Sequence, residues 1–199
     1  MELDVQPLLL APGEGEAVTD RRERTLVVEL HAHSAYSFLD GASLPEELAA
    51  RAAELGYEAL ALTDHDGVYG SLEFAHAAKA FGVRPITGAE VTLRGGAHVT
   101  LLVESARGYA NLCRLLTSAH ADTRPKPTEL VPPALDPAFL AELNEGLVCL
   151  SGCARDGLGI QDPNGAAELA RAFGREQFFV DQKRGDGVFH KENPKRGNR

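Results

Sequence analysis

The sequence is short of cysteine, and it contains no long apolar run. Its three cysteines in 199 residues are an odd number, which favours a reducing compartment over a disulfide framework. It has no run of 18 apolar residues, and its first residues have neither the basic start nor the apolar core of a secretory signal. These absences argue against a secreted or membrane-spanning protein. We expect a cytoplasmic location and no membrane partner.

An excess of positive charge is also lacking. The formal net charge is −9, which argues against strong binding to nucleic acid by this chain alone. The charge is uneven, because residues 181–199 hold six Lys/Arg and three Asp/Glu, whereas residues 1–180 hold 14 basic and 26 acidic residues. With 44% hydrophobic residues, a chain of this length can bury one sizeable core. We expect a polar N-terminal extension over 1–25, one domain over 26–180 and a basic tail over 181–199.

Apolar runs alternate with segments of helical periodicity along the chain. The pattern predicts strands over residues 25–30, 58–63, 84–93, 98–104, 147–150 and 177–180. It predicts helices over about 43–56, 70–81, 106–120, 139–146 and 163–174, with a proline-rich loop over 122–137. This alternation is typical of βαβ units and a mostly parallel sheet. Because no Gly-x-Gly-x-x-Gly loop follows a strand, a barrel-like α/β fold is favoured over an open dinucleotide-binding sheet.

The helix over 43–56 has the clearest end signals. Ser43 can cap its N-terminus, with Glu46 completing a capping box, and Gly56 suits its C-terminal cap. The periodicity then predicts three buried residues on one face: Leu48, Ala52 and Leu55.

Residues with metal-binding side chains stand at or beside the expected strands. His31 and His33 follow the first strand, and residues two apart in an extended segment point to the same side. The C-terminal ends of barrel strands meet on one face, so candidates that are distant in sequence can converge. Taken singly, a His-x-His pair is more often an ordinary surface or core pair, and a cysteine after a strand is more often a small buried hydrophobe. Together the candidates favour a metal site: His31, His33, His65, Glu90, His98 and Cys153.

Other candidates have plainer interpretations. His120 ends an expected helix, where a cation suits the helix dipole. Cys113 and Cys149 fall within an expected helix and strand, where we expect them to be core residues.

Five segments carry a family resemblance: "ELHAHSAYSFLDGAS", "ALTDHDGVYG", "PITGAEV", "HVTLLVESARGYANLCRLLTSAH" and "GLVCLSGCARDGL". Together they resemble the amino-terminal PHP (polymerase and histidinol phosphatase) domain of bacterial C-family DNA polymerases, most of all the error-prone alpha-type branch. The resemblance covers about residues 26–180. It implies a distorted (β/α)7 barrel that holds up to three divalent ions, commonly zinc, manganese or iron. It also implies a parent polymerase that uses magnesium and has DNA and its remaining polymerase domains as partners.

The resemblance carries metal ligands over to this chain by motif. In chain order these are His31, His33, Asp40, His65, Glu90, His98 and Cys153. Glu90 matches the carboxylate that bridges two metals, and Cys153 stands where other members use a histidine. The resemblance implies a 3′–5′ exonuclease or phosphoesterase chemistry, with no catalytic residue beyond the ligands and no organic cofactor.

The sequence departs from the family at its C-terminal end. A late Asp-x-His pair is absent, since His190 has Val188 two residues before it, and the polymerase motifs are also absent. We therefore expect a barrel that is incomplete at this end, impaired hydrolysis and no DNA synthesis by this chain alone. Two alternatives stay open: a free-standing phosphoesterase of the histidinol-phosphatase type, and a non-catalytic scaffold in which metal stabilises the fold.

Overall fold

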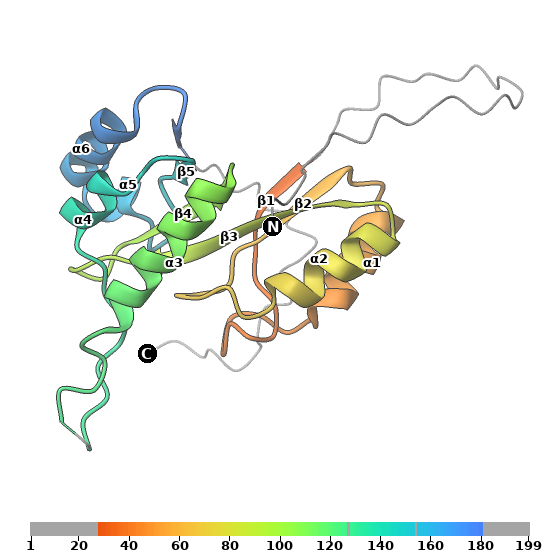
Figure 1. Cartoon of the computed structure of the whole chain (residues 1–199), viewed down its shortest axis with the longest axis horizontal. Coiled ribbons are helices and arrows are strands. Elements are labelled where there is room, and N and C mark those ends of the chain that lie inside the picture. The colour runs from red at the N-terminus through yellow and green to blue at the C-terminus, as the bar shows by residue number, and fades with distance from the viewer. Residues whose placement is uncertain (1–27, 127, 154, 181–199) are drawn as a thin grey trace, which may run out of the picture.

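A computed structural model describes residues 28–126, 128–153 and 155–180 of the chain (Figure 1). The expected N-terminal extension and basic tail lie outside these residues. The strands are β1 (Val28–Ala32), β2 (Ala59–Leu62), β3 (Arg84–Thr92), β4 (His98–Val103), β5 (Leu147–Leu150) and β6 (Phe178–Phe179). The helices are α1 (Pro45–Glu54), α2 (Ser71–Ala80), α3 (Ala106–His120), α4 (Pro137–Glu142), α5 (Leu158–Gln161) and α6 (Pro163–Phe173).

The strands form one sheet in the order β1-β2-β3-β4-β5-β6. The pairings β1–β2, β2–β3 and β5–β6 are parallel, as expected, but β4 runs antiparallel to both β3 and β5. The sheet was expected to be mostly parallel, and β4 is the strand that departs from that direction. The physical reason is the connection, because a tight turn joins β3 to β4 through Gly95 and Gly96, which have φ of 104° and 90°. A parallel partner would need a crossover of a dozen residues or more.

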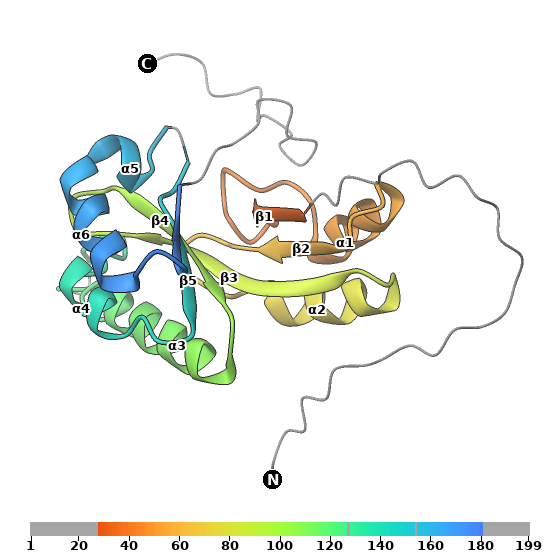
Figure 2. The same ribbon diagram turned by 90° about the horizontal axis from the view of Figure 1, so that it is seen from above.

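The sheet curls into an incomplete barrel, with its helices in two groups (Figures 1 and 2). Helices α1 and α2 pack beside β1–β3, and α3 to α6 gather around the half that contains β4 and β5. Each group encloses its own apolar core, one around Leu60 and Phe74 and the other around Leu101 and Leu112. A third, smaller cluster consists of strand residues alone: Ala61, Leu102 and Leu150, with Leu30, Ile86 and Val148 against it. The expected α/β fold with an incomplete barrel is confirmed.

Helix α1 begins one residue later than the sequence suggested. Its N-cap is Leu44, whose backbone N–H donates to Glu47 Oε2 at 2.9 Å, so the predicted capping box of Ser43 and Glu46 is wrong. The proline explains the shift, because Pro45 takes the first helical position, where its missing N–H costs nothing. Leu55 is 37% exposed, so its predicted burial is also wrong, whereas Leu48 and Ala52 are buried.

The C-terminal cap of α1 is as predicted. Gly56 has φ of 73°, and it donates to the Ala53 carbonyl at 3.0 Å while Tyr57 donates to the Ala52 carbonyl at 2.9 Å. This pair of bonds is a Schellman motif, which favours glycine at the left-handed position. Helix α3 has the predicted bounds, and the short helix α5 is one that the pattern missed. No helix within the described residues is long and apolar enough to cross a membrane.

Candidate metal centre

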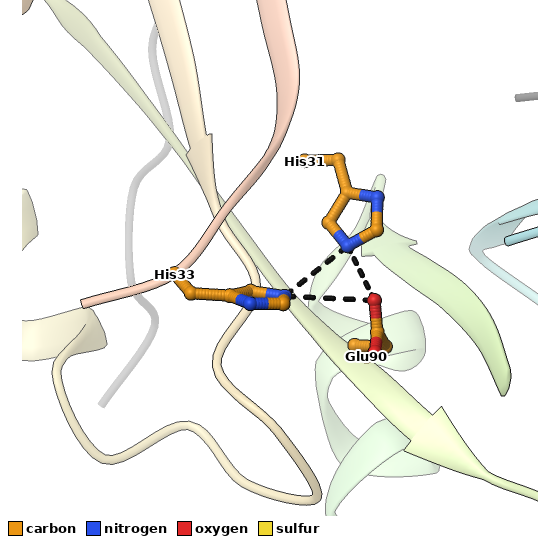
Figure 3. Close-up of side chains that lie close together, drawn as sticks. All are labelled: His31, His33 and Glu90. Carbon is orange, nitrogen blue, oxygen red and sulfur yellow. Dashed lines mark hydrogen bonds and ion pairs between the residues drawn. The ribbon is translucent and has the colours of Figure 1, made fainter. Parts of the chain in front are cut away.

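Glu90 lies at the centre of a cluster of four histidines. Its side chain is 3% exposed, and its two carboxylate oxygens face different pairs of rings. Oε2 contacts Nε2 of His31 and lies 3.5 Å from Nε2 of His33 (Figure 3). Oε1 lies 3.1 Å from Nδ1 of His65 and 2.8 Å from Nδ1 of His98. The carboxylate thus stands between two imidazole pairs.

The strands explain why these residues meet. His31 and His33 flank the end of β1 on one side, which leaves their Nε2 atoms 3.1 Å apart. His65 follows β2, and its backbone forms an isolated parallel β-bridge with Glu90 of β3. His98 begins β4 rather than following a strand, and it reaches the same edge of the sheet because β4 is antiparallel to β3.

Asp40 reaches the cluster through His65. Its Oδ2 lies 3.1 Å from Nε2 of His65, whereas the other ring nitrogen, Nδ1, faces Glu90. A tight turn presents it, since the N–H groups of Asp40 and Gly41 donate to the Ser37 carbonyl at 3.1 and 2.8 Å. Position 41 requires glycine, because a Cβ there would lie 1.7 Å from the Ser34 carbonyl oxygen.

A buried aspartate next to His65 holds the surrounding loops, and the sequence analysis missed it. The carboxylate of Asp64, which is 1% exposed, accepts bonds from the Ser34 N–H at 2.7 Å, the Ser37 hydroxyl at 2.8 Å and the Gly70 N–H at 3.3 Å. The Ser37 hydroxyl oxygen in turn accepts from the His65 N–H at 3.0 Å. Two loops, 33–44 and 63–70, are therefore tied to one carboxylate. The signal available in the sequence was an acidic residue directly after the predicted strand over 58–63.

Asp66 and His120 form a second support. The Asp66 carboxylate accepts from the N–H and hydroxyl of Thr92, each at 2.8 Å. His120 donates from Nε2 to the Asp66 carbonyl at 2.7 Å, so it links the end of α3 to the loop after β2. This contact adds a specific role to the dipole effect expected of His120.

The cluster sets the protonation of its own members. Burial alone would raise the pKa of Glu90, but hydrogen bonds from His31, His33 and His98 hold it well below the usual range. Burial lowers the pKa of His33, against the opposing effect of Glu90. The hydrogen bond to Glu90 raises the pKa of His98. Glu90 is therefore an ionised carboxylate, and His33 favours the neutral form that carries a free lone pair for a cation.

The donor atoms fit divalent ions. Two groups have donor atoms that all lie within 4.8 Å of one another: His31, His33 and Glu90, and His65, Glu90 and His98. Two ligands of one tetrahedral ion, bound at about 2.1 Å, lie roughly 3.4 Å apart. The spacings of 3.1 Å between His31 and His33 and 3.5 Å between His33 and Glu90 are of this size. Imidazole and carboxylate suit zinc, iron and manganese.

Cys153 is in neither group of donors found among the described residues. Its backbone nevertheless belongs to the loop beside His98, because the Cys153 carbonyl accepts from the Gly157 N–H at 2.9 Å and the His98 N–H donates to the Asp156 carbonyl at 2.9 Å. The assignment of Cys153 as a ligand, like the ligand role of the other six residues, stays a prediction. Cys149 is buried as expected, and Cys113 is partly buried.

The sequence profile of the PHP domain matches residues 29–182. The chain belongs to the PHP domain family. The expected resemblance is confirmed, and the curated relatives of the chain agree with the error-prone branch.

Those relatives are much longer proteins. The error-prone DNA polymerase of Symbiobacterium thermophilum is 46% identical over 139 residues, which cover 64% of this chain and 13% of that protein. The error-prone DNA polymerase of Mycolicibacterium paratuberculosis is 38% identical over 192 residues, which cover 87% of this chain and 17% of that protein. The chain thus spans less than a fifth of the length of either relative.

Solved structures agree on the fold. A Bifidobacterium adolescentis protein, provisionally classed as a metal-dependent phosphoesterase, has a TM-score of 0.55 at 13% sequence identity. The match covers 79% of this chain and 77% of the Bifidobacterium chain. An amidohydrolase from Chromobacterium violaceum, with bound sulfate and no metal, has a TM-score of 0.54 at 20% sequence identity. The match covers 77% of this chain and 75% of the amidohydrolase chain.

Proposed function

We propose that the chain is the PHP domain of an error-prone DNA polymerase and that its metal centre hydrolyses phosphodiester bonds at the 3′ end of single-stranded DNA. The division of Glu90 between two imidazole pairs is the observation that carries this proposal, because one carboxylate can then serve two cations at once. Two divalent ions a few ångströms apart are the usual requirement for displacement at phosphorus.

Each residue of the centre has a role in this proposal. His31 and His33 hold one ion with Glu90, and His65 and His98 hold another with the same carboxylate. The two remaining ligands, proposed from the family motif, are Asp40 and Cys153. Zinc, iron or manganese suits this donor set, whereas magnesium would serve synthesis in the parent polymerase. Such ions, when bound, lower the pKa of a water and neutralise charge on the phosphate.

The reaction consumes one water for each bond. The water oxygen forms a bond to phosphorus, the bond from phosphorus to the 3′ oxygen breaks, and the leaving oxygen receives a proton. DNA and the remaining polymerase domains are the proposed partners in the parent protein. The other domains would be needed to bind DNA, because a chain of net charge −9 has little attraction for a phosphate backbone.

The chain alone should hydrolyse DNA weakly. The family's late Asp-x-His pair is absent from the sequence, so fewer ligands remain to hold a full set of ions. The cluster joins side chains on or beside β1 to β4, and this arrangement supports a second candidate, a metal that stabilises the fold. The length of the relatives counts against a free-standing phosphoesterase.

The test combines metal content with activity. We expect the purified chain to retain one or two divalent ions by elemental analysis, and to cleave single-stranded DNA from its 3′ end slowly in manganese. His33→Ala should remove the metal and the cleavage, whereas His76→Ala, a matched change at an exposed position of α2, should remove neither. Metal that is retained without cleavage would favour the structural role. The codons that follow residue 199 in the gene would test the parentage, and limited proteolysis would test the proposed boundaries at 25 and 180.

A further inference from the structure

Two apolar side chains project into solvent beside the metal centre. Phe38 is 83% exposed and Leu39 is 74% exposed, and Phe38 is the most exposed large hydrophobic residue in the described part of the chain. They are the two central residues of the turn from Ser37 to Asp40. Exposed apolar side chains lose the free energy of burial, so packing does not explain why positions 38 and 39 are apolar.

Both ends of this turn are fixed to the same histidine of the cluster. The Ser37 hydroxyl accepts from the His65 N–H at 3.0 Å, and the Asp40 carboxylate lies 3.1 Å from the His65 ring. Phe38 directly follows the first anchor and Leu39 directly precedes the second. Since one residue spans at most about 3.6 Å, both residues stay within a few ångströms of the anchors.

The backbone of the turn is held in an unfavourable conformation. Leu39 has φ of 76°, in the left-handed region that bulky residues rarely adopt. The turn follows residues that are fixed in place, because Ser34 and Ser37 both donate hydrogen bonds to the Asp64 carboxylate. Backbone strain that persists beside a candidate active site is the kind of outlier from which a functional role can be inferred.

We propose that Phe38, supported by Leu39, is a stacking platform for the base of the nucleotide whose phosphodiester lies at the metal centre. The inference rests on the proposed function and names the part of the substrate that this turn recognises. Every base has a π-face, so one exposed ring can hold any base without sequence preference. Stacking also suits an acidic chain, because it needs no positive charge.

The charges around the turn support a base rather than a membrane surface. The neighbouring charged side chains include Asp40, Glu46 and Glu47, and the partner of the Tyr36 hydroxyl is Glu73 at 3.0 Å. An anionic lipid surface attracts clusters of Lys and Arg instead. A nucleobase carries no charge, and its phosphate would meet the cations of the centre.

The test measures stacking directly. The probe is a short single-stranded oligothymidylate that ends in a 3′ 2-aminopurine, whose fluorescence is quenched when it stacks. With manganese present, we expect saturable quenching by the wild-type chain and a loss of affinity of roughly 5- to 150-fold in Phe38→Ala. Phe38→Trp should retain the affinity, and Phe38→Leu should lose it, because leucine is apolar but has no ring.

Controls separate stacking from other effects. Phe81→Ala removes another exposed phenylalanine, at the far end of α2, and should bind as the wild type does. An oligonucleotide with an abasic 3′ end should bind wild type and Phe38→Ala equally. Equal quenching by wild type and Phe38→Ala, or full binding by Phe38→Leu, would overturn the proposal. Loss of manganese or a lowered melting temperature in Phe38→Ala would also overturn it, because the side chain would then support the metal centre or the fold.

The same samples distinguish the two proposals. Quenching that depends on Phe38, without any cleavage of the DNA, would contradict hydrolysis and leave the stacking platform in place. Cleavage that is lost in His33→Ala but kept in Phe38→Ala, with the same quenching in Phe38→Ala as in the wild type, would support hydrolysis and contradict the platform. Absence of quenching by the wild-type chain would also contradict the platform.

Discussion

Glu90 and His98 lie on the same face of the hairpin formed by β3 and β4, with Oε1 and Nδ1 2.8 Å apart. The register explains this, because Glu90 pairs with Thr100, and His98 stands two residues before Thr100 on the same side of β4. A slip of one residue would turn His98 to the other face and separate the two side chains. The Gly95–Gly96 turn that fixes the register therefore also positions His98, a predicted metal ligand.

The central position of Glu90 gives the first prediction. Glu90→Gln replaces the charge that faces both imidazole pairs with a neutral amide, so the affinity of both proposed ion sites should fall together. We expect a fall of at least about tenfold in affinity for zinc or manganese, the scale on which disturbed metal sites respond. Isothermal titration would measure it. Glu54→Gln, at an exposed residue of α1, is the matched control, and equal affinity in both variants would contradict the central role.

The second prediction concerns Asp64, whose carboxylate accepts hydrogen bonds from Ser34, Ser37 and Gly70 and so holds the loops that carry Asp40 and His65. Asp64→Asn places an amide NH₂ among donors from Ser34, Ser37 and Gly70, so at least one of them loses its acceptor. We expect a loss of about 2–4 kcal/mol in the free energy of unfolding. Urea denaturation would measure it, with Asp122→Asn at an exposed position as the control. A change under about 0.5 kcal/mol would show that the loops stand without Asp64.

The sequence predicts the elements better than it predicts the contacts between them. The bounds of α3 follow from local signals, since Ser105 caps it through the Gly108 N–H at 3.1 Å and apolar residues repeat at helical spacing. The common direction of His31 and His33 could likewise be predicted, because residues two apart in an extended segment point to the same side. The role of Asp64 could not, because its partners Ser34 and Ser37 lie 30 and 27 residues away and their positions depend on how two loops fold.

The direction of β4 is the feature of the sheet that the alternation of strands and helices left open. Alternating apolar runs mark a strand but carry no information on its direction, and the Arg94-Gly95-Gly96 turn was the one signal for a hairpin. His98 begins its strand, and it still converges with His33 and His65 because the antiparallel direction brings the start of β4 to the edge where β1 and β2 end.

The third prediction corrects an expectation about the N-terminus of α1. Since the N-cap is Leu44, with Glu47 bonded to its N–H, Ser43→Ala should change the free energy of unfolding by less than about 0.5 kcal/mol. Ser105→Ala removes an observed cap and should cost about 1 kcal/mol. Chemical denaturation of both variants would measure the difference. A larger loss in Ser43→Ala than in Ser105→Ala would restore the original capping box.

The last prediction concerns Cys153, for which the sequence and the geometry give different indications. The family motif makes it a ligand, whereas the structure places it in the loop beside His98 but outside both groups of donors. Its thiol lies in a partly exposed position, while burial raises the pKa of Cys149 and keeps that thiol protonated. Of these two cysteines, Cys149 is therefore excluded as a thiolate ligand.

Cobalt substitution can decide the question, because a thiolate bound to Co²⁺ gives an intense charge-transfer absorption that imidazole and carboxylate do not give. We expect this band in the wild-type chain, its loss in Cys153→Ser, and its retention in Cys113→Ser, which changes another partly buried cysteine. Cobalt should still bind to Cys153→Ser, more weakly, since His98 and Glu90 remain. If the wild-type chain binds cobalt without the band, Cys153 is not a ligand, and the second ion is held by imidazole and carboxylate alone.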